Sequence, residues 1–219
     1  MEADELEENH IRRLPVFVVI DCSGSMRGEP IHAMEMGLQT LLHDLKEDPV
    51  CLDSVWLSVI AFGSVVELLL PLSDLDFSEI PDLHAEGATC MGEAIKFTRD
   101  QISQEVRNTT ENTKGDWKPM LFLFTDGKPT DDWEDQADEF KNSGEALIVA
   151  CGAGPEVEDE VLNRIGHHAL HLNDTQPGTL TEFMNWVSQS VTIRSHSIGR
   201  GASQDDEIPM PSHDSILLN

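Results

Sequence analysis

Residues 14–26 read LPVFVVIDCSGSM. The run LPVFVVI over 14–20 is short and apolar, which is typical of a strand buried inside a parallel sheet. Asp21, Ser23 and Ser25 follow on alternate residues, so one carboxylate and two hydroxyls lie where the strand ends. Open α/β sheets bind their ligands beyond the carboxyl ends of their strands. This stretch therefore predicts a central strand and, directly after it, a candidate ligand site.

Strand-like and helix-like patterns alternate along the rest of the chain. Strands are predicted over 54–62, 120–124, 146–151 and, more weakly, 169–172, and helices over 29–46, 94–106, 132–142, 158–165 and 179–193. Another strand, over 65–70, follows the strand over 54–62 after only Gly63 and Ser64, so these two form an antiparallel hairpin. The predicted fold class is α/β: a doubly wound, mainly parallel sheet with one antiparallel edge strand and helices on both faces.

Three segments are expected within the 219 residues. Residues 1–11 form an acidic amino-terminal segment, residues 12–194 form one α/β domain with a single core, and residues 195–219 form a flexible carboxyl-terminal tail. From residue 195 the sequence loses its periodicity and gathers serine, glycine, proline and acidic residues. The closing apolar residues 216–218 leave open whether the end of the tail docks on the domain.

The chain is strongly acidic, with 14 basic and 41 acidic residues and a net charge of -27. A charge of this sign repels nucleic acid and anionic membranes, so neither is expected as a partner. The first nine residues, MEADELEEN, are acidic where a signal peptide is basic, and the apolar runs are shorter than the roughly 20 residues that span a bilayer. A cytoplasmic location is therefore expected.

Four cysteines occur at positions 22, 51, 90 and 151, without a CxxC pair. They fall in or beside predicted strands and turns. This placement favours small packed side chains over disulfides or zinc ligands.

Two further oxygen-bearing side chains are predicted to lie near Asp21, Ser23 and Ser25. Thr89 precedes the helix over 94–106, and Asp126 follows the strand over 120–124. Hydroxyls and carboxylates are hard ligands that suit Mg²⁺, Ca²⁺ or Mn²⁺ better than zinc or copper, and a serine-rich set with few carboxylates favours Mg²⁺. The alternative is that Asp21, Ser23 and Ser25 only cap the following helix.

At these residues the chain resembles the von Willebrand factor A family. That family builds a metal-ion-dependent adhesion site from Asp-x-Ser-x-Ser, a threonine on a second loop and an aspartate on a third. The resemblance implies that Ser23, Ser25 and Thr89 contact the metal directly and that Asp21 and Asp126 are its charge-bearing ligands. It also implies a Rossmann-like domain and an open coordination position for the acidic side chain of a protein partner.

Within this family the chain is most similar to the tellurite-resistance TerY type. The similar stretches are RRLPVFVVIDCSGSMRGEPI over 12–31, GDWKP over 115–119 and TDGKPTDDW over 125–133. TerY-like proteins are associated with a serine/threonine kinase and a PP2C-type phosphatase. The resemblance therefore implies an adaptor or regulator in a phosphorylation system that is linked to tellurite or stress resistance.

Two functions from different classes are compatible with the sequence. The first is a metal-dependent protein-binding module without enzymatic activity. The second is a Mg²⁺-dependent phosphohydrolase of the haloacid dehalogenase type, which uses an aspartate nucleophile and a second acid two residues later. Position 23 is serine, and the motifs GxSxG, GxxxxGK and HExxH are absent, so binding is favoured over catalysis.

Other acidic residues leave two questions open. Asp131 and Asp132 follow the third loop, where they either belong to the site or complement the dipole of the next helix. An acid of the tail could also occupy the open metal position of its own or of a neighbouring molecule. The candidates are Asp205, Asp206, Glu207 and Asp214.

Overall fold

The computed structural model describes residues 12–199 and 216–218. Strand β1 (Leu14–Asp21) lies in the interior of a seven-stranded sheet, and all eight of its residues are buried. The strands lie in the order β3-β2-β1-β4-β5-β6-β7. The others are β2 (Val55–Phe62), β3 (Val66–Asp74), β4 (Met120–Thr125), β5 (Leu147–Ala153), β6 (His168–Leu172) and β7 (Ile216–Leu218).

Successive strands are added on one side of β1 as far as β3 and on its other side from β4 onward. Strand β1 pairs in parallel with β2 on one side and with β4 on the other, and β5 and β6 continue the parallel sheet beyond β4. The ends of β1 and β4 are therefore the point where the two halves of the sheet diverge. In doubly wound sheets ligands bind at such a point.

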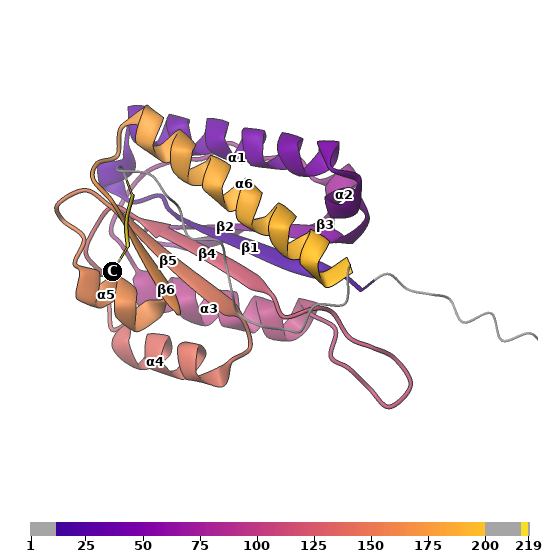
Figure 1. Cartoon of the computed structure of the whole chain (residues 1–219). Coiled ribbons are helices and arrows are strands. Elements are labelled where there is room, and N and C mark those ends of the chain that lie inside the picture. Colours follow the sequence, from indigo (N-terminus) through magenta and orange to yellow (C-terminus); the bar gives the residue numbers. More distant parts are fainter. Residues whose placement is uncertain (1–11, 200–215, 219) are drawn as a thin grey trace, which may run out of the picture.

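Helices cover both faces of the sheet (Figure 1). One face carries α1 (Glu29–Glu47), α2 (Pro49–Ser54) and α6 (Pro177–Gly199), and the other carries α3 (Met91–Glu105), α4 (Glu134–Ser143) and α5 (Asp159–Ile165). Alternate residues of β1 supply the two cores, with Val16, Val18 and Ile20 on one face and Phe17 and Val19 on the other. This alternation explains why both faces of the predicted strand are apolar.

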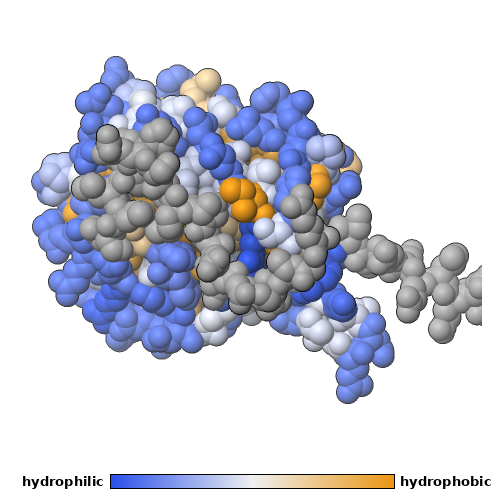
Figure 2. Space-filling view, viewed as in Figure 1, coloured by the Kyte–Doolittle hydropathy of each residue, from blue (hydrophilic) through white to orange (hydrophobic). Residues whose placement is uncertain are grey.

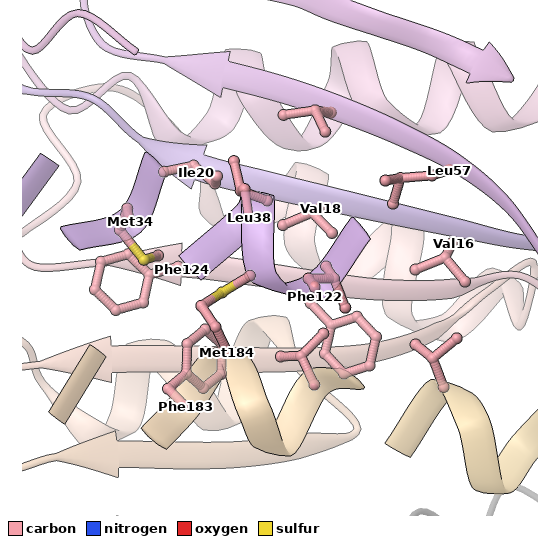
Figure 3. Packing of buried hydrophobic residues seen from close by; sticks show 14 of the residues in the cluster. Val16, Val18, Ile20, Met34, Leu38, Leu57, Phe122, Phe124, Phe183 and Met184 are labelled. Atoms are coloured by element: carbon pink, nitrogen blue, oxygen red, sulfur yellow. The ribbon is translucent and has the colours of Figure 1, made fainter. Parts of the chain in front are cut away.

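The core under α1 and α6 is built mainly from large aliphatic and aromatic side chains (Figure 3). The rings of Phe124 and Phe183 lie 5.7 Å apart, and the rings of Phe122 and Trp186 lie 5.9 Å apart at nearly a right angle. These contacts hold α6 against β4, the strand that leads into Asp126. The core thus fixes the strand that precedes the predicted site loop at Asp126.

The two outer strands of the sheet are both antiparallel to their neighbours. The predicted hairpin is confirmed, although β3 is longer than expected because it continues through Pro71 to Asp74. Proline has no N–H for a second neighbour, which suits an edge strand. The β2–β3 register shifts near Val59, where the Ser58 hydroxyl donates a hydrogen bond to the Leu70 carbonyl.

The carboxyl-terminal boundary differs from the prediction. Helix α6 continues to Gly199 instead of ending near residue 193, and Ser195 is buried, so the domain does not stop at residue 194. Residues 216–218 form β7, which pairs antiparallel with β6 and adds a second antiparallel edge. The predicted acidic segment 1–11 and the tail acids Asp205, Asp206, Glu207 and Asp214 lie outside the described residues.

An ion pair joins the start of β1 to the loop before β4. The Arg13 guanidinium donates two hydrogen bonds to the Asp116 carboxylate and a third to the Glu105 carbonyl at the end of α3. The Asp116 carboxylate also accepts the Arg107 backbone N–H. Only 9% of the Arg13 side chain and 2% of the Asp116 side chain are exposed, so this arrangement is a buried clamp at the amino-terminal ends of the strands.

A short helix, α2, was not predicted. Pro49 is its first residue, and the Asp48 carboxylate caps it by accepting the backbone N–H groups of Val50 and Cys51. The same carboxylate contacts His196 Nε2 on α6 at 2.9 Å. Asp48 therefore ties α2 to the last helix.

We expect Asp48→Ala to destabilise the fold by about 1 kcal/mol near neutral pH, because it removes this helix cap. Burial acts to raise the pKa of Asp48, but the hydrogen bonds from Cys51, His196 and Val50 outweigh burial and lower it. The stabilisation is therefore complete above the unfolded-state pKa and is lost as the pH falls through the lower folded-state pKa. Urea unfolding of both proteins as a function of pH measures this, and a difference that persists unchanged in acid contradicts it.

Two further features belong to the described residues. No helix among residues 12–199 is both long enough and apolar enough to cross a bilayer. All four cysteines are free, and three of them are buried, as packing side chains should be. The described surface that faces the viewer in Figure 2 is predominantly hydrophilic.

Candidate metal centre

The loop after β1 begins with a buried carboxylate. Asp21 has no exposed surface, and its Oδ1 accepts the Ser23 backbone N–H at 2.8 Å. The 3-10 helix η1 (Gly24–Met26) follows, but the Ser23 side chain does not cap it and instead places its Oγ 3.0 Å from Ser25 Oγ. Helix α1 has Gly28 at its N-cap position. The capping interpretation of the two serines is therefore wrong.

The loop after β4 meets this first loop. Ser25 Oγ donates a hydrogen bond of 2.7 Å to Asp126 Oδ1, which joins residues that are 101 positions apart in the sequence. Thr125 Oγ1 donates another, of 2.6 Å, to Asp21 Oδ2. Sequence reasoning missed Thr125, although its position directly before Asp126 at the end of a buried strand was a signal. Thr125 is fully buried and orients the Asp21 carboxylate.

Thr89 belongs to the same site. Its side chain is buried, and a Cβ added at Gly127 would lie 3.3 Å from Thr89 Oγ1 and 3.9 Å from Ser25 Oγ. Both hydroxyls therefore lie beside the turn that follows Asp126. The Thr130 N–H donates to the Thr89 carbonyl at 2.9 Å, and this bond holds the second loop against the third. All five predicted residues thus lie on three loops that contact one another.

Asp131 has a role that the sequence did not reveal. Its carboxylate accepts the backbone N–H groups of Gly92 and Glu93, each at 3.0 Å, so it caps the amino terminus of α3 from another loop. A Cβ at Gly92 would lie only 2.2 Å from the Asp132 carbonyl oxygen, so this close approach requires glycine. Asp132 itself is exposed and makes no recorded contact with the site.

A comparison with protein families identifies the domain. The model of the von Willebrand factor type A domain matches residues 16–186, which is more than half of the chain. The chain belongs to this family. This von Willebrand factor A domain therefore has the fold that its sequence predicts, while the narrower TerY-type resemblance stays a prediction.

Several known proteins are similar to this von Willebrand factor A domain. An uncharacterized protein of Synechocystis is 30% identical over 128 residues, covering 55% of this chain and 27% of that protein. A von Willebrand factor type A structure from Catenulispora acidiphila is 19% identical with a TM-score of 0.64, covering 82% of this chain and 43% of that one. The zinc-occupied proximal thread matrix protein 1 of the mussel byssus is 17% identical with a TM-score of 0.60, covering 83% and 48%.

The chain matches only part of each of these proteins. The chain spans about a quarter of the Synechocystis protein and less than half of the two structural relatives. At identities below 20% the two structures establish the shared fold of the von Willebrand factor A domain. Zinc occupies the metal-ion-dependent adhesion site (MIDAS) motif of the mussel protein, and this occupancy is a property of that protein.

Burial makes the site of this von Willebrand factor A domain receptive to positive charge. Burial raises the pKa of Asp21 to about 6, against the opposing effect of the hydrogen bonds from Thr125 and Ser23, and the charge of Asp126 raises it further. Burial also raises the pKa of Asp126. None of the ion pairs recorded among the described residues involves either carboxylate. A bound cation would offset the cost of burying both negative charges.

The donor set fits a hard divalent cation. Ser25 donates its one hydroxyl hydrogen bond to Asp126, so the Ser23 hydroxyl is the donor of the 3.0 Å contact between the two serines. One lone pair of the Ser25 oxygen then remains to accept a cation. Among the described residues no group of three or more His, Cys, Asp or Glu side chains is arranged to hold a metal, so the site depends on its hydroxyls. Burial, with the charges of Asp21 and Glu67, raises the pKa of the Cys22 thiol to about 12, so Cys22 offers no thiolate.

Proposed function

We propose that this domain is a metal-dependent protein-binding module rather than an enzyme. The observation that carries the proposal is the Ser25–Asp126 hydrogen bond, which draws the first and third loops into one oxygen-lined site. Thr125 and the Ser23 N–H hold the Asp21 carboxylate in a fixed orientation before any ligand arrives. A preformed arrangement of this kind lowers the ordering cost of binding.

The residues that would hold the cation are Asp21, Ser23, Ser25, Thr89 and Asp126. When bound, the cation supplies a coordination position for an oxygen of a partner's aspartate or glutamate. Mg²⁺ is the favoured ion because neutral hydroxyls outnumber carboxylates in the set, and Ca²⁺ and Mn²⁺ are the alternatives. The zinc-occupied MIDAS of the mussel protein adds Zn²⁺ to the ions that should be tested.

The biological setting that we propose follows from the TerY-type resemblance of residues 12–31, 115–119 and 125–133. In this setting the domain is a cytoplasmic adaptor or regulator, and its partners include a serine/threonine kinase and a PP2C-type phosphatase. The partner's acidic side chain would bind at the metal centre. Phosphorylation of either protein would then alter docking by adding negative charge.

The runner-up, a phosphohydrolase that uses Asp21 as its nucleophile, receives less support. Both oxygens of this carboxylate accept hydrogen bonds, Oδ1 from the Ser23 N–H and Oδ2 from the Thr125 hydroxyl, and the side chain is fully buried. Each oxygen keeps a lone pair that a small cation can use, but the side chain has no exposed surface that a phosphoester could approach. The serine at position 23 also leaves the second acid of that chemistry without a counterpart.

Calorimetric titration of the purified chain with MgCl₂ tests the first step of the proposal. We expect a saturable heat with one ion bound per chain, and we expect MnCl₂, CaCl₂ and ZnCl₂ to compete for the same site. A titration without any saturable binding of the four ions contradicts the proposal. Mg²⁺-dependent hydrolysis of a generic phosphoester that is lost in Asp21→Asn would favour the phosphohydrolase instead.

A further inference from the structure

A cavity of about 450 Å³ lies directly beside the candidate metal centre. Its walls come from the end of β2, the turn into β3 and the loop over 82–86 that leads to Thr89. Cys22, which also lines the cavity, is the residue between Asp21 and Ser23 in the sequence. The cavity and the metal centre therefore share one wall.

Backbone hydrogen bonds fix the shape of this cavity. The Glu86 N–H donates to the Cys22 carbonyl at 2.7 Å, and the Cys90 N–H donates to the Gly63 carbonyl at 3.1 Å. A Cβ at Gly63 would lie 2.7 Å from the Glu86 carbonyl oxygen, so the three loops are already in close contact. The cavity is thus preformed, as ligand sites commonly are.

The lining combines apolar and acidic side chains. Val65 is exposed and Leu69 is half-buried, and the exposed residues Glu67, Asp82 and Glu86 add three carboxylates. No ion pair recorded among residues 12–199 joins any of these three carboxylates to a basic side chain. His84 is the one histidine among the described lining residues, so the lining carries a net negative charge near neutral pH.

The arrangement does not suit a second metal ion. Within the described residues no group of three or more acidic, histidine or cysteine side chains is placed to hold one. Cys22 is only 4% exposed and lines the cavity, and its thiol has no recorded hydrogen bond to a described residue. A ligand with N–H donors would give this sulfur a partner, since sulfur is a weak acceptor.

We propose that the cavity receives a lysine or arginine side chain of the protein segment whose acidic residue binds the metal centre. This inference rests on the proposed function. A long basic side chain that lies along the cavity would pack its apolar stem against Val65 and Leu69 and place its charged head among the three carboxylates. It would also offset the repulsion between an acidic partner residue and a protein with a net charge of -27.

The shared wall limits the spacing of the two partner residues. Consecutive Cα atoms lie about 3.8 Å apart, so Cys22 brings the cavity to within one residue of the ligands Asp21 and Ser23. An acidic and a basic residue a few positions apart in an extended partner segment would therefore reach both sites. The recognised feature is a short zwitterionic motif.

Selection of random linear peptides on the immobilised full chain tests this inference. Peptides that bind in MgCl₂ and elute with EDTA are sequenced for the wild type and for the triple variant Glu67→Gln, Asp82→Asn, Glu86→Gln. The control variant neutralises three exposed acids by Glu47→Gln, Asp53→Asn and Glu111→Gln. They lie at the end of α1, in α2 and between α3 and β4, which is the side of the sheet where β2 and β4 begin. We expect wild-type and control peptides to carry an acid with a nearby lysine or arginine.

The cavity variant should select peptides that keep the acid but lose the nearby basic residue. A synthetic copy of a wild-type peptide should bind this variant about tenfold more weakly by fluorescence anisotropy and bind the control variant unchanged. Acid-bearing peptides without basic enrichment on the wild type would overturn the cavity assignment and leave the proposed function standing. If no acid-bearing peptide elutes with EDTA, both proposals fail together.

Discussion

Asp126→Ala should weaken Mg²⁺ binding by about 100-fold or more, because it removes one of only two carboxylates in the five-residue site. The remaining carboxylate, Asp21, would face the cation with three neutral hydroxyls. Ser25 would also lose the acceptor that orients its hydroxyl. Calorimetric titration should then show no saturable heat at ion concentrations that saturate the wild type.

The matched control for this change is Asp132→Asn. Asp132 lies six positions further along the same segment, is exposed, and makes no recorded contact with the site. The Asp132→Asn variant should bind Mg²⁺ as the wild type does. A cooperative unfolding curve should show that the Asp126→Ala variant is folded. Equal Mg²⁺ affinity of Asp126→Ala and the wild type would remove Asp126 from the site.

Asp116→Ala should be the most destabilising change outside the two cores. It leaves the nearly buried Arg13 guanidinium without its bidentate carboxylate and leaves the Arg107 N–H without its acceptor. Removing one partner of a buried pair costs about 3–5 kcal/mol, because the other charge remains buried and uncompensated. Urea unfolding followed by circular dichroism measures this loss.

An exposed pair gives the comparison for this experiment. Arg164 and Asp138 also form a bidentate contact, but 40% and 48% of their side chains are exposed. Solvent screens such a pair, so Asp138→Ala should leave the unfolding curve almost unchanged. Similar losses for Asp116→Ala and Asp138→Ala would mean that burial of the clamp does not determine its strength.

The central part of the fold could be predicted because its signals are local. The apolar run over 14–20 identified β1, and the short link at Gly63 and Ser64 identified the antiparallel edge. The site followed from these elements, because Asp21 and Asp126 both lie where neighbouring parallel strands end. Thr89 could be added because it precedes a helix that returns to the same edge of the sheet.

The remaining features depend on contacts between distant segments. The Thr125–Asp21 hydrogen bond forms because β4 lies beside β1, and Asp131 caps α3 rather than the helix that follows it. The three residues of β7 carry too short a pattern to indicate which strand they would join. Helix α2 has only six residues, fewer than two turns, which gives little helical periodicity to detect.

Helix α3 has hydrogen bonds to other segments at both of its ends, one near each end of the sheet. Its first turn is fixed by Asp131, beside the third loop of the metal centre, and its last residue, Glu105, binds both Arg13 and the Leu72 N–H. A helix of 15 residues is a stiff rod about 22 Å long. Movement of the Asp131 loop along this axis would strain the cap of α3 or the contacts of Glu105. Helix α3 therefore connects the binding edge of the sheet to the buried Arg13–Asp116 clamp at the opposite edge.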